Sequence, residues 1–174
     1  MEVSEDDAYN FAYVLPPEHP DDDVELVIPL ALQIGWCDSP VYFCSATETA
    51  RDVADKLFRE NTPVPFHPQE EIIMNIDWKS LPKEIREDED NCLVHCLEVY
   101  IDDFIGMIQA TDEPTLKRFT QCVLEGITSV FPDPKLTGSK MGPPISPSKL
   151  EEEGPWSTRK EILGWLMDGL ARTI

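Results

Sequence analysis

The sequence contains no long apolar run and opens without a secretion signal. No apolar stretch approaches the roughly 20 residues that a membrane-spanning helix needs. Met1 is followed by acidic residues rather than by a basic segment and an apolar core, which argues against a signal peptide. We therefore expect an intracellular, non-secreted protein with no membrane partner. The sequence leaves the cytoplasm and the nucleus both open as its compartment.

Basic residues are also scarce. The chain carries 14 Lys and Arg against 34 Asp and Glu, a formal net charge of −20. Proteins that bind nucleic acid on their own usually present a basic patch that neutralises phosphates. We therefore do not expect this chain alone to bind nucleic acid tightly. The acidic clusters, at residues 5–7, 21–23, 87–90 and 151–153, are expected to lie in solvated loops.

Several catalytic and metal-binding motifs are missing. There is no internal repeat, no glycine-rich phosphate loop, no Ser/His/Asp order and no zinc-protease helix. The five cysteines are odd in number, which favours reduced thiols in an intracellular compartment. Cys92, His95 and Cys96 form the nearest approach to a zinc site, but no second ligand pair follows at finger-like spacing. Core thiols are therefore the preferred interpretation.

The residues that are present predict one domain of the α+β class, because 174 residues with 41% apolar content can build a real core. Ser39 and Pro40 form a typical helix start, and Asp112 with Pro114 forms another. The expected segments are a strand pair over 1–34 (strands near 9–15 and 24–30), a loop and helix over 35–59, an insertion loop over 60–92 with a short strand near 72–76, a hairpin over 93–109, a helix over 112–131, and an end segment over 132–174 that is largely irregular to residue 155.

The chain is organised around residues 99–106, which read Val-Tyr-Ile-Asp-Asp-Phe-Ile-Gly. Strand-forming residues on both sides of two aspartates predict a β-hairpin with Asp102 and Asp103 at its tip. Two interpretations stay open for this pair. It is either a solvated Asp-Asp turn or a site for Mg²⁺, which prefers a few carboxylates together with substrate phosphates.

Three short motifs, in this order, resemble the palm subdomain of retroelement reverse transcriptases. They are Gly-Trp-Cys-Asp-Ser-Pro at 35–40, Tyr-Ile-Asp-Asp at 100–103 and Lys-Glu-Ile-Leu-Gly-Trp at 160–165. The resemblance implies a palm-like antiparallel sheet with two packed helices, with 132–174 as the end of the palm. It also implies an RNA-directed DNA polymerase, in which two Mg²⁺ ions help a primer 3′-hydroxyl attack a nucleotide triphosphate.

The resemblance also implies residue roles. Asp102 would be the direct metal ligand, and Asp103 a weaker or indirect one. Tyr100 would face the primer end, and Ile101 would line the nucleotide or primer site. The partners of the full-length parent would be template-primer nucleic acid and dNTP. The residues expected at the nucleotide pocket are Gln33, Gly35 and Trp36.

One part of the family pattern is absent. The other metal ligand of the family belongs to a preceding strand with a pattern like Asp-x-x-Asp-Gly-Phe, and no such pattern occurs here. The sequence thus predicts a partial palm that begins after the first catalytic aspartate and is inactive alone. One alternative is a host-retained acidic palm-like module for binding or scaffolding, without catalysis. Another is an unrelated α+β domain with a coincidental Asp-Asp turn.

Overall fold

The structure is a computed structural model, and it describes residues 4, 6–15, 17, 19, 23–29, 39–76, 95–110, 112–132, 143–169, 171 and 173. The chain forms two compact units, Met1–Ser45 and Ala46–Ile174. Small antiparallel sheets and packed helices confirm the expectation of a mixed helix and strand protein. Among the described helices, none is long and apolar enough to cross a membrane.

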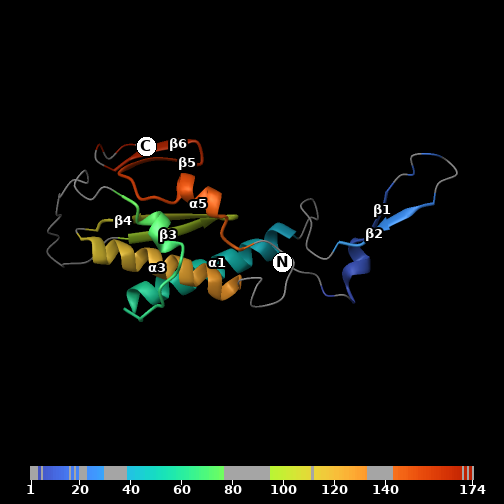
Figure 1. Cartoon of the computed structure of the whole chain (residues 1–174), viewed down its shortest axis with the longest axis horizontal. Coiled ribbons are helices and arrows are strands. Elements are labelled where there is room, and N and C mark those ends of the chain that lie inside the picture. The colour runs from blue at the N-terminus through green and yellow to red at the C-terminus, as the bar shows by residue number, and fades with distance from the viewer. Residues whose placement is uncertain are drawn as a thin grey trace. The chain divides into compact units, whose positions relative to one another are not determined.

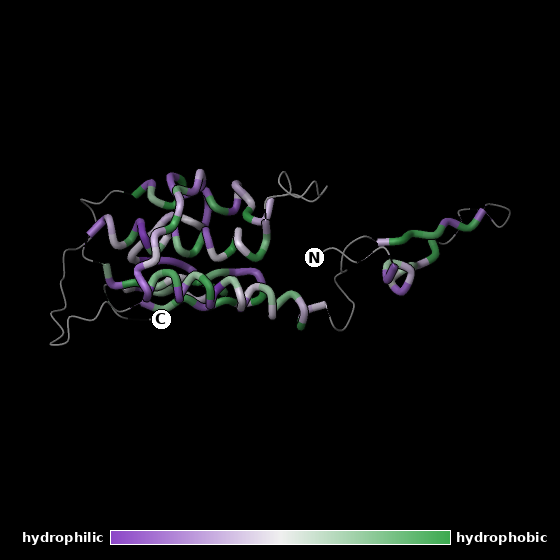
Figure 2. Tube along the Cα trace, turned by 90° about the horizontal axis from the view of Figure 1, so that it is seen from below, coloured by the Kyte–Doolittle hydropathy of each residue, from purple (hydrophilic) through white to green (hydrophobic). Residues whose placement is uncertain are grey.

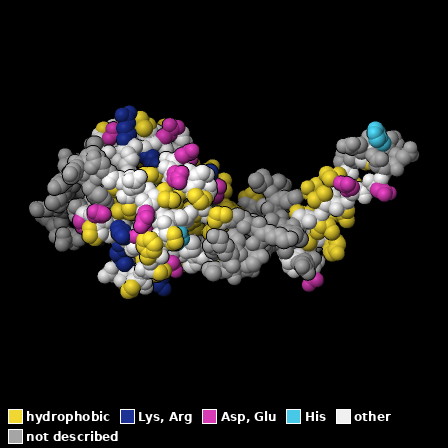
Figure 3. Space-filling view, viewed as in Figure 1, with side chains coloured by type: hydrophobic (Ala, Val, Ile, Leu, Met, Phe, Trp, Pro, Cys, Tyr) yellow, Lys and Arg dark blue, Asp and Glu magenta, His cyan; other side chains and the backbone are white. Residues whose placement is uncertain are grey.

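The first unit contains a short two-stranded ribbon. A 3-10 helix, η1 (Ala8–Phe11), precedes β1 (Tyr13–Leu15), which pairs antiparallel with β2 (Glu25–Val27). The expected strand pair is therefore present, but each strand is shorter than predicted. The side chains of β1 are all exposed, so this strand has no buried face. Figure 3 shows apolar side chains gathered over this ribbon.

Two long helices form the framework of the rest of the molecule. The helix α1 (Ser39–Arg59) begins at the predicted residue, and α3 (Glu113–Val130) follows the predicted cap. The Asp112 carboxylate accepts a hydrogen bond from the Thr115 backbone N–H at 2.8 Å, which satisfies one unpaired donor of the first turn. Both helix predictions are confirmed. Figure 2 shows hydrophilic and hydrophobic residues alternating along these helices, as expected for amphipathic segments.

The helices α1 and α3 cross very closely at Gly126. A Cβ atom at this position would lie 2.5 Å from the Ala50 carbonyl oxygen and 2.7 Å from the Ala54 Cβ, so only glycine fits. Both helices run along one face of the strands β3 (His95–Tyr100) and β4 (Asp103–Ile108) (Figure 1). The buried cluster between them consists of Ala54, Phe58, Leu97, Phe119 and Cys122.

The long connection after α1 is part of this packed unit as far as it is described. The short strand predicted near residues 72–76 is wrong, because the chain forms a helix, α2 (Glu70–Ile73). The reason is tertiary: one helical turn places Glu70 and Ile73 on the same side, and both are buried. The Glu70 carboxylate lies 3.0 Å from the Lys117 ammonium and accepts a hydrogen bond from the Gln121 amide at 2.8 Å.

The end segment is also more regular than predicted. A helix, α5 (Pro147–Glu153), lies within the stretch expected to be irregular, with Ser146 as its N-cap and proline at its first position. It is followed by β5 (Arg159–Ile162) and β6 (Trp165–Asp168), which pair antiparallel. The prolines and serines that suggested a loop therefore include a helix start of the same kind as Ser39-Pro40.

Candidate functional site: a carboxylate-bearing hairpin tip

The predicted hairpin is confirmed, with a register that defines its tip. Tyr100 pairs with Asp103, so only Ile101 and Asp102 form the loop. The sequence placed both aspartates in the turn, whereas Asp103 is the first residue of β4. The reason is that a two-residue loop requires its flanking residues to pair with each other. Asp102 is exposed, and Asp103 is half-buried.

The backbone at Ile101 is strained. Its φ is 59°, in the left-handed region that β-branched residues rarely adopt. Such a conformation costs about 1–2 kcal/mol in a residue other than glycine. It persists only where the surrounding structure imposes it, and here the ladder of β3 and β4 closes directly on both sides of the loop. No local residue pattern predicted this strain.

The two faces of the hairpin differ. Residues paired directly across an antiparallel ladder point to the same face, and successive residues alternate. Leu97 belongs to the buried cluster with α1 and α3, and Val99, Phe104 and Gly106 lie on the same face of the ladder as Leu97. The residues on the opposite face are Glu98, Tyr100, Asp103 and Ile105. Tyr100 is 56% exposed, so an aromatic ring and the Asp103 carboxylate share an accessible face.

Packing at Gly106 fastens the hairpin to the helices. A Cβ atom there would lie 3.0 Å from Phe119 Cε1 and 3.1 Å from Trp156 Cη2, so the two aromatic rings press onto the bare backbone. The Trp156 indole N–H donates to Thr120 Oγ1 at 2.8 Å, which fixes the orientation of the ring. Sequence reasoning missed Trp156, because the contact joins segments far apart in the chain.

Polar contacts hold the β3 edge against α1. The Arg51 guanidinium lies 3.4 Å from the Glu98 carboxylate and 2.8 Å from that of Asp52. The His95 Nε2 atom lies 2.9 Å from Asp55 Oδ1. The His95 ring also packs edge-on against Phe58, with ring centroids 4.8 Å apart. These contacts limit movement of the strand that leads to the carboxylates.

The cysteine and histidine group considered for zinc is divided by the strand. His95 faces the helices, whereas Cys96, the next residue along β3, points to the other side. Cys92 lies outside the described residues. Burial raises the pKa of the Cys122 thiol in the core. Within the described part of the chain, no three His, Cys, Asp or Glu side chains are grouped so that they could hold a metal ion.

The structure does not bring all the predicted site residues together. Gln33, Gly35 and Trp36 lie outside the described residues, so their expected place at a nucleotide pocket is not described. The described site therefore consists of four consecutive residues, Tyr100, Ile101, Asp102 and Asp103.

The Leu-Gly motif forms a second tight hairpin. Its loop residues Leu163 and Gly164 have φ values of 51° and 80°, and positive φ at both positions is typical of a type I′ turn. Leu163 and Trp165 are 51% and 66% exposed, so the loop presents apolar groups to solvent. The Lys160 ammonium donates to the carbonyl oxygens of Glu153 and, at 3.1 Å, Pro155. Burial lowers the pKa of Lys160.

The chain was compared with models of protein families, with curated proteins and with solved structures, and none of the three comparisons found a match.

Proposed function

We propose that residues 95–108 form the catalytic hairpin of a reverse-transcriptase palm, the part of an RNA-directed DNA polymerase that carries nucleotidyl transfer. One observation carries the proposal. Adjacent carboxylates occupy the tip of a hairpin, and the strands of this hairpin pack closely against Phe119 and Trp156 at Gly106. A solvated turn needs no such rigidity, whereas catalytic ligands must be held in place by their surroundings.

The residue roles proposed here are those that the resemblance to the reverse-transcriptase palm implies. Asp102, in the exposed loop, is the direct ligand for Mg²⁺, and Asp103, at the start of β4, is a weaker one. Tyr100 offers its exposed ring to the primer end, and Ile101 lies at the nucleotide or primer site. The exposed Leu163-Gly164 loop is a second apolar surface for the primer end. Gln33, Gly35 and Trp36 remain proposed nucleotide contacts.

The donor set fits one weakly held, hydrated Mg²⁺ ion. Two carboxylates are suitable hard ligands, and Mg²⁺ keeps several waters in such sites. The described residues supply no third carboxylate for a pair of ions. When bound, Mg²⁺ neutralises charge at the reacting phosphate. The register of the hairpin places Asp103 directly across from Tyr100 and Asp102 in the adjoining loop. We therefore propose that the chain alone does not extend a primer.

Magnesium titration of the isotope-labelled full chain tests the site. We expect Mg²⁺-dependent NMR shifts confined to residues 100–103, lost in the variant Asp102→Asn/Asp103→Asn. The matched control is Glu152→Gln/Glu153→Gln, which removes two adjacent exposed carboxylates from α5. Mg²⁺-dependent NMR shifts of equal size around Asp102–Asp103 and around Glu152–Glu153 would mean that the hairpin tip is an ordinary solvated turn.

Primer extension tests the activity. The chain is incubated with an RNA template, a DNA primer, dNTPs and Mg²⁺, and we expect no extension above that of the Asp102→Asn variant. Extension that requires Asp102 would support the polymerase site and overturn the proposed inactivity.

A second candidate function is an acidic palm-like binding or scaffold module without catalysis. The net charge of −20 favours it, because such a surface attracts basic proteins and repels nucleic acid. Figure 3 shows acidic side chains at several separate places on the visible face. Binding of a defined basic protein that survives moderate salt and is unchanged in Asp102→Ala/Asp103→Ala would support this function. Loss of binding at moderate salt would exclude it.

A further inference from the structure

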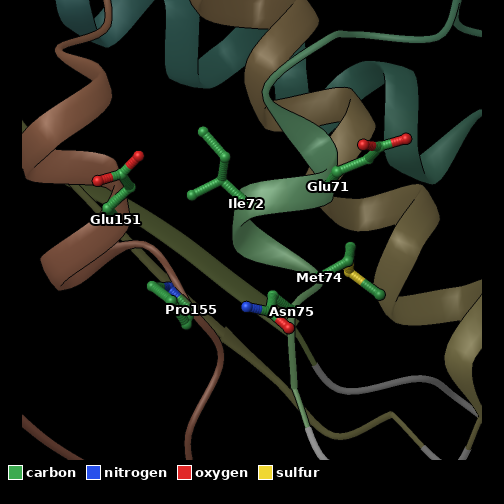
Figure 4. A pocket seen from close by; sticks show the side chains of 6 residues that line it. All are labelled: Glu71, Ile72, Met74, Asn75, Glu151 and Pro155. Carbon is green, nitrogen blue, oxygen red and sulfur yellow. The ribbon is translucent and has the colours of Figure 1, made fainter.

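We propose that the groove between α2 and α5 binds an arginine side chain of a basic polypeptide partner. The groove is shallow and widely open to solvent, with a volume of about 670 Å³. It is lined by Glu71, Ile72, Met74, Asn75, Glu151 and Pro155. Figure 4 shows Glu71 and Glu151 on opposite sides of the Ile72 side chain, with the Glu71 carboxylate directed away from it. The site is separate from the Asp102–Asp103 hairpin and does not depend on its function.

Both walls of the groove are held by contacts outside it. Buried Glu70 fixes α2 through its contacts with Lys117 and Gln121. The Gln69 side-chain amide donates to the Ile145 carbonyl oxygen at 3.3 Å, which ties the start of α2 to the approach to α5. Lys160 holds the Pro155 carbonyl on the other wall. A groove formed in advance loses less conformational entropy when a partner side chain enters.

The charge of the groove selects a cation. Two of its six lining residues are carboxylates, and none is Lys or Arg. Of the two lysines close to its walls, Lys117 pairs with buried Glu70 and also interacts electrostatically with Glu71, and Lys160 donates to backbone carbonyls. Since the whole chain carries a net charge of −20, long-range attraction also favours a basic partner.

The shape and chemistry favour arginine over other cations. Half-buried Ile72, Met74 and Pro155 provide an apolar floor on which the methylene stem of an arginine can pack. The planar guanidinium offers five donors, which suit a carboxylate together with the side-chain oxygen of Asn75. An ammonium group is more strongly hydrated and makes fewer directed contacts, so lysine is expected to bind more weakly.

Titration of the labelled full chain with a tetra-arginine peptide tests the proposal. We expect NMR shifts centred on residues 71–75 and 151–155, weaker effects from tetra-lysine, and none from the neutral tetra-citrulline. The variant Glu71→Gln/Glu151→Gln should raise the Kd on the order of tenfold, because charge-assisted hydrogen bonds are lost. Both residues are exposed, so the variant is expected to fold, which circular dichroism would verify.

The matched control is Glu48→Gln/Glu161→Gln, which makes the same change in net charge at exposed residues outside the groove. Its Kd should stay close to that of the unmodified chain. An equal loss of affinity in both variants, or shifts spread over the chain, would overturn the proposal in favour of general attraction to an acidic protein. Equal binding of spermine at the same residues would overturn the assignment to arginine.

Discussion

At the scale of single residues, Ile101 has the most unusual backbone of the candidate site. It occupies a left-handed conformation between two paired strands, and the ladder on both sides keeps it there. A glycine would adopt the same φ without strain, although it would lose more conformational freedom on folding. The left-handed backbone of the tip therefore conflicts with the conformational preference of isoleucine, the residue at this position. Such conflicts are typical of functional positions.

We predict that Ile101→Gly raises the free energy of unfolding, by up to about 1 kcal/mol, because relief of strain exceeds the entropic cost of glycine. Urea unfolding measures this change. The control is Ile105→Gly in regular β4, where glycine should be destabilising. If both variants lose stability equally, the backbone at residue 101 is not strained.

Glu70 is a second residue whose environment decides its chemistry. Its side chain is 2% exposed, and burial alone would raise its pKa. Hydrogen bonds from Gln121 and Lys117, together with the charge of Lys117, outweigh burial and hold the pKa of Glu70 below its ordinary value of 4.5. A carboxyl group with a lowered pKa in the folded state stabilises that state above its unfolded pKa, and this contribution disappears as pH falls through the folded pKa.

We therefore predict that the chain loses stability as pH falls below 4.5, and that Glu70→Gln weakens this dependence. At neutral pH the variant Glu70→Ala should lower the free energy of unfolding by about 1–3 kcal/mol, because it leaves Gln121 without its partner. Chemical unfolding at several pH values measures both effects. Glu48→Gln, at an exposed position, serves as the control. An identical pH dependence in Glu70→Gln and the control would contradict the prediction.

At the scale of elements, the crossing of α1 and α3 depends on the absence of a side chain at Gly126. Alanine is a better helix former than glycine by about 1 kcal/mol. Here, however, its Cβ would lie 2.5 Å from the Ala50 carbonyl oxygen, a backbone atom that cannot move alone. Overpacking of this kind costs about 1–3 kcal/mol. The close approach therefore outweighs helix propensity at this position.

Gly126→Ala is accordingly predicted to lower the thermal midpoint of unfolding, despite its favourable helix propensity. The control is Ser129→Ala on the exposed part of the same helix, where the effect should be small. A Gly126→Ala variant as stable as the control would show that α1 and α3 can separate without cost.

The elements also show what could be read from the sequence. The caps at Ser39 and Asp112 were predictable, because capping depends on residues within one turn. The helix α2 was not, because its β-branched Ile72 and Ile73 favour a strand locally and the burial of Glu70 depends on distant Lys117. The start of α5 at Ser146 and Pro147 carried a usable signal, but the surrounding prolines and glycines concealed it.

The same division applies to the candidate site. Alternating apolar residues and two aspartates were enough to predict the hairpin. The left-handed Ile101 and the division of the aspartates between loop and strand depend on register, which the pattern did not fix. The contacts of Gly106 with Phe119 and Trp156 join separate segments and could not be predicted from local sequence.

At the scale of the whole molecule, charge of one sign dominates. With 34 acidic against 14 basic residues, repulsion within the folded chain is expected to lower its stability at neutral pH. The ion pairs of Arg51 and Arg59 are partly exposed, and such pairs contribute little. Screening by salt should therefore weaken the repulsion among the acidic groups more than it weakens the attraction within the ion pairs.

We predict that the thermal midpoint rises when NaCl increases from about 0.01 M to about 0.15 M, which shortens the Debye length from about 30 Å to about 8 Å. Differential scanning calorimetry at neutral pH measures the shift. Sucrose at matched osmolality provides the control for effects other than screening. A midpoint that falls with NaCl would mean that the ion pairs stabilise the folded chain more than repulsion among the excess negative charges destabilises it.

Among the elements that the structure describes, the ribbon of β1 and β2 is expected to open first. It is held by three residue pairs, and its β1 side chains are exposed to solvent. Two-stranded ribbons of this kind are marginally stable in water, so their amide hydrogens exchange through small, frequent fluctuations. The side chains of Phe119 and Leu124 bury one face of α3, so exchange of the α3 amides requires a much larger opening. The chain is thus expected to exchange hydrogen in two kinetic classes, and a protease at low concentration should cut first in the fast one.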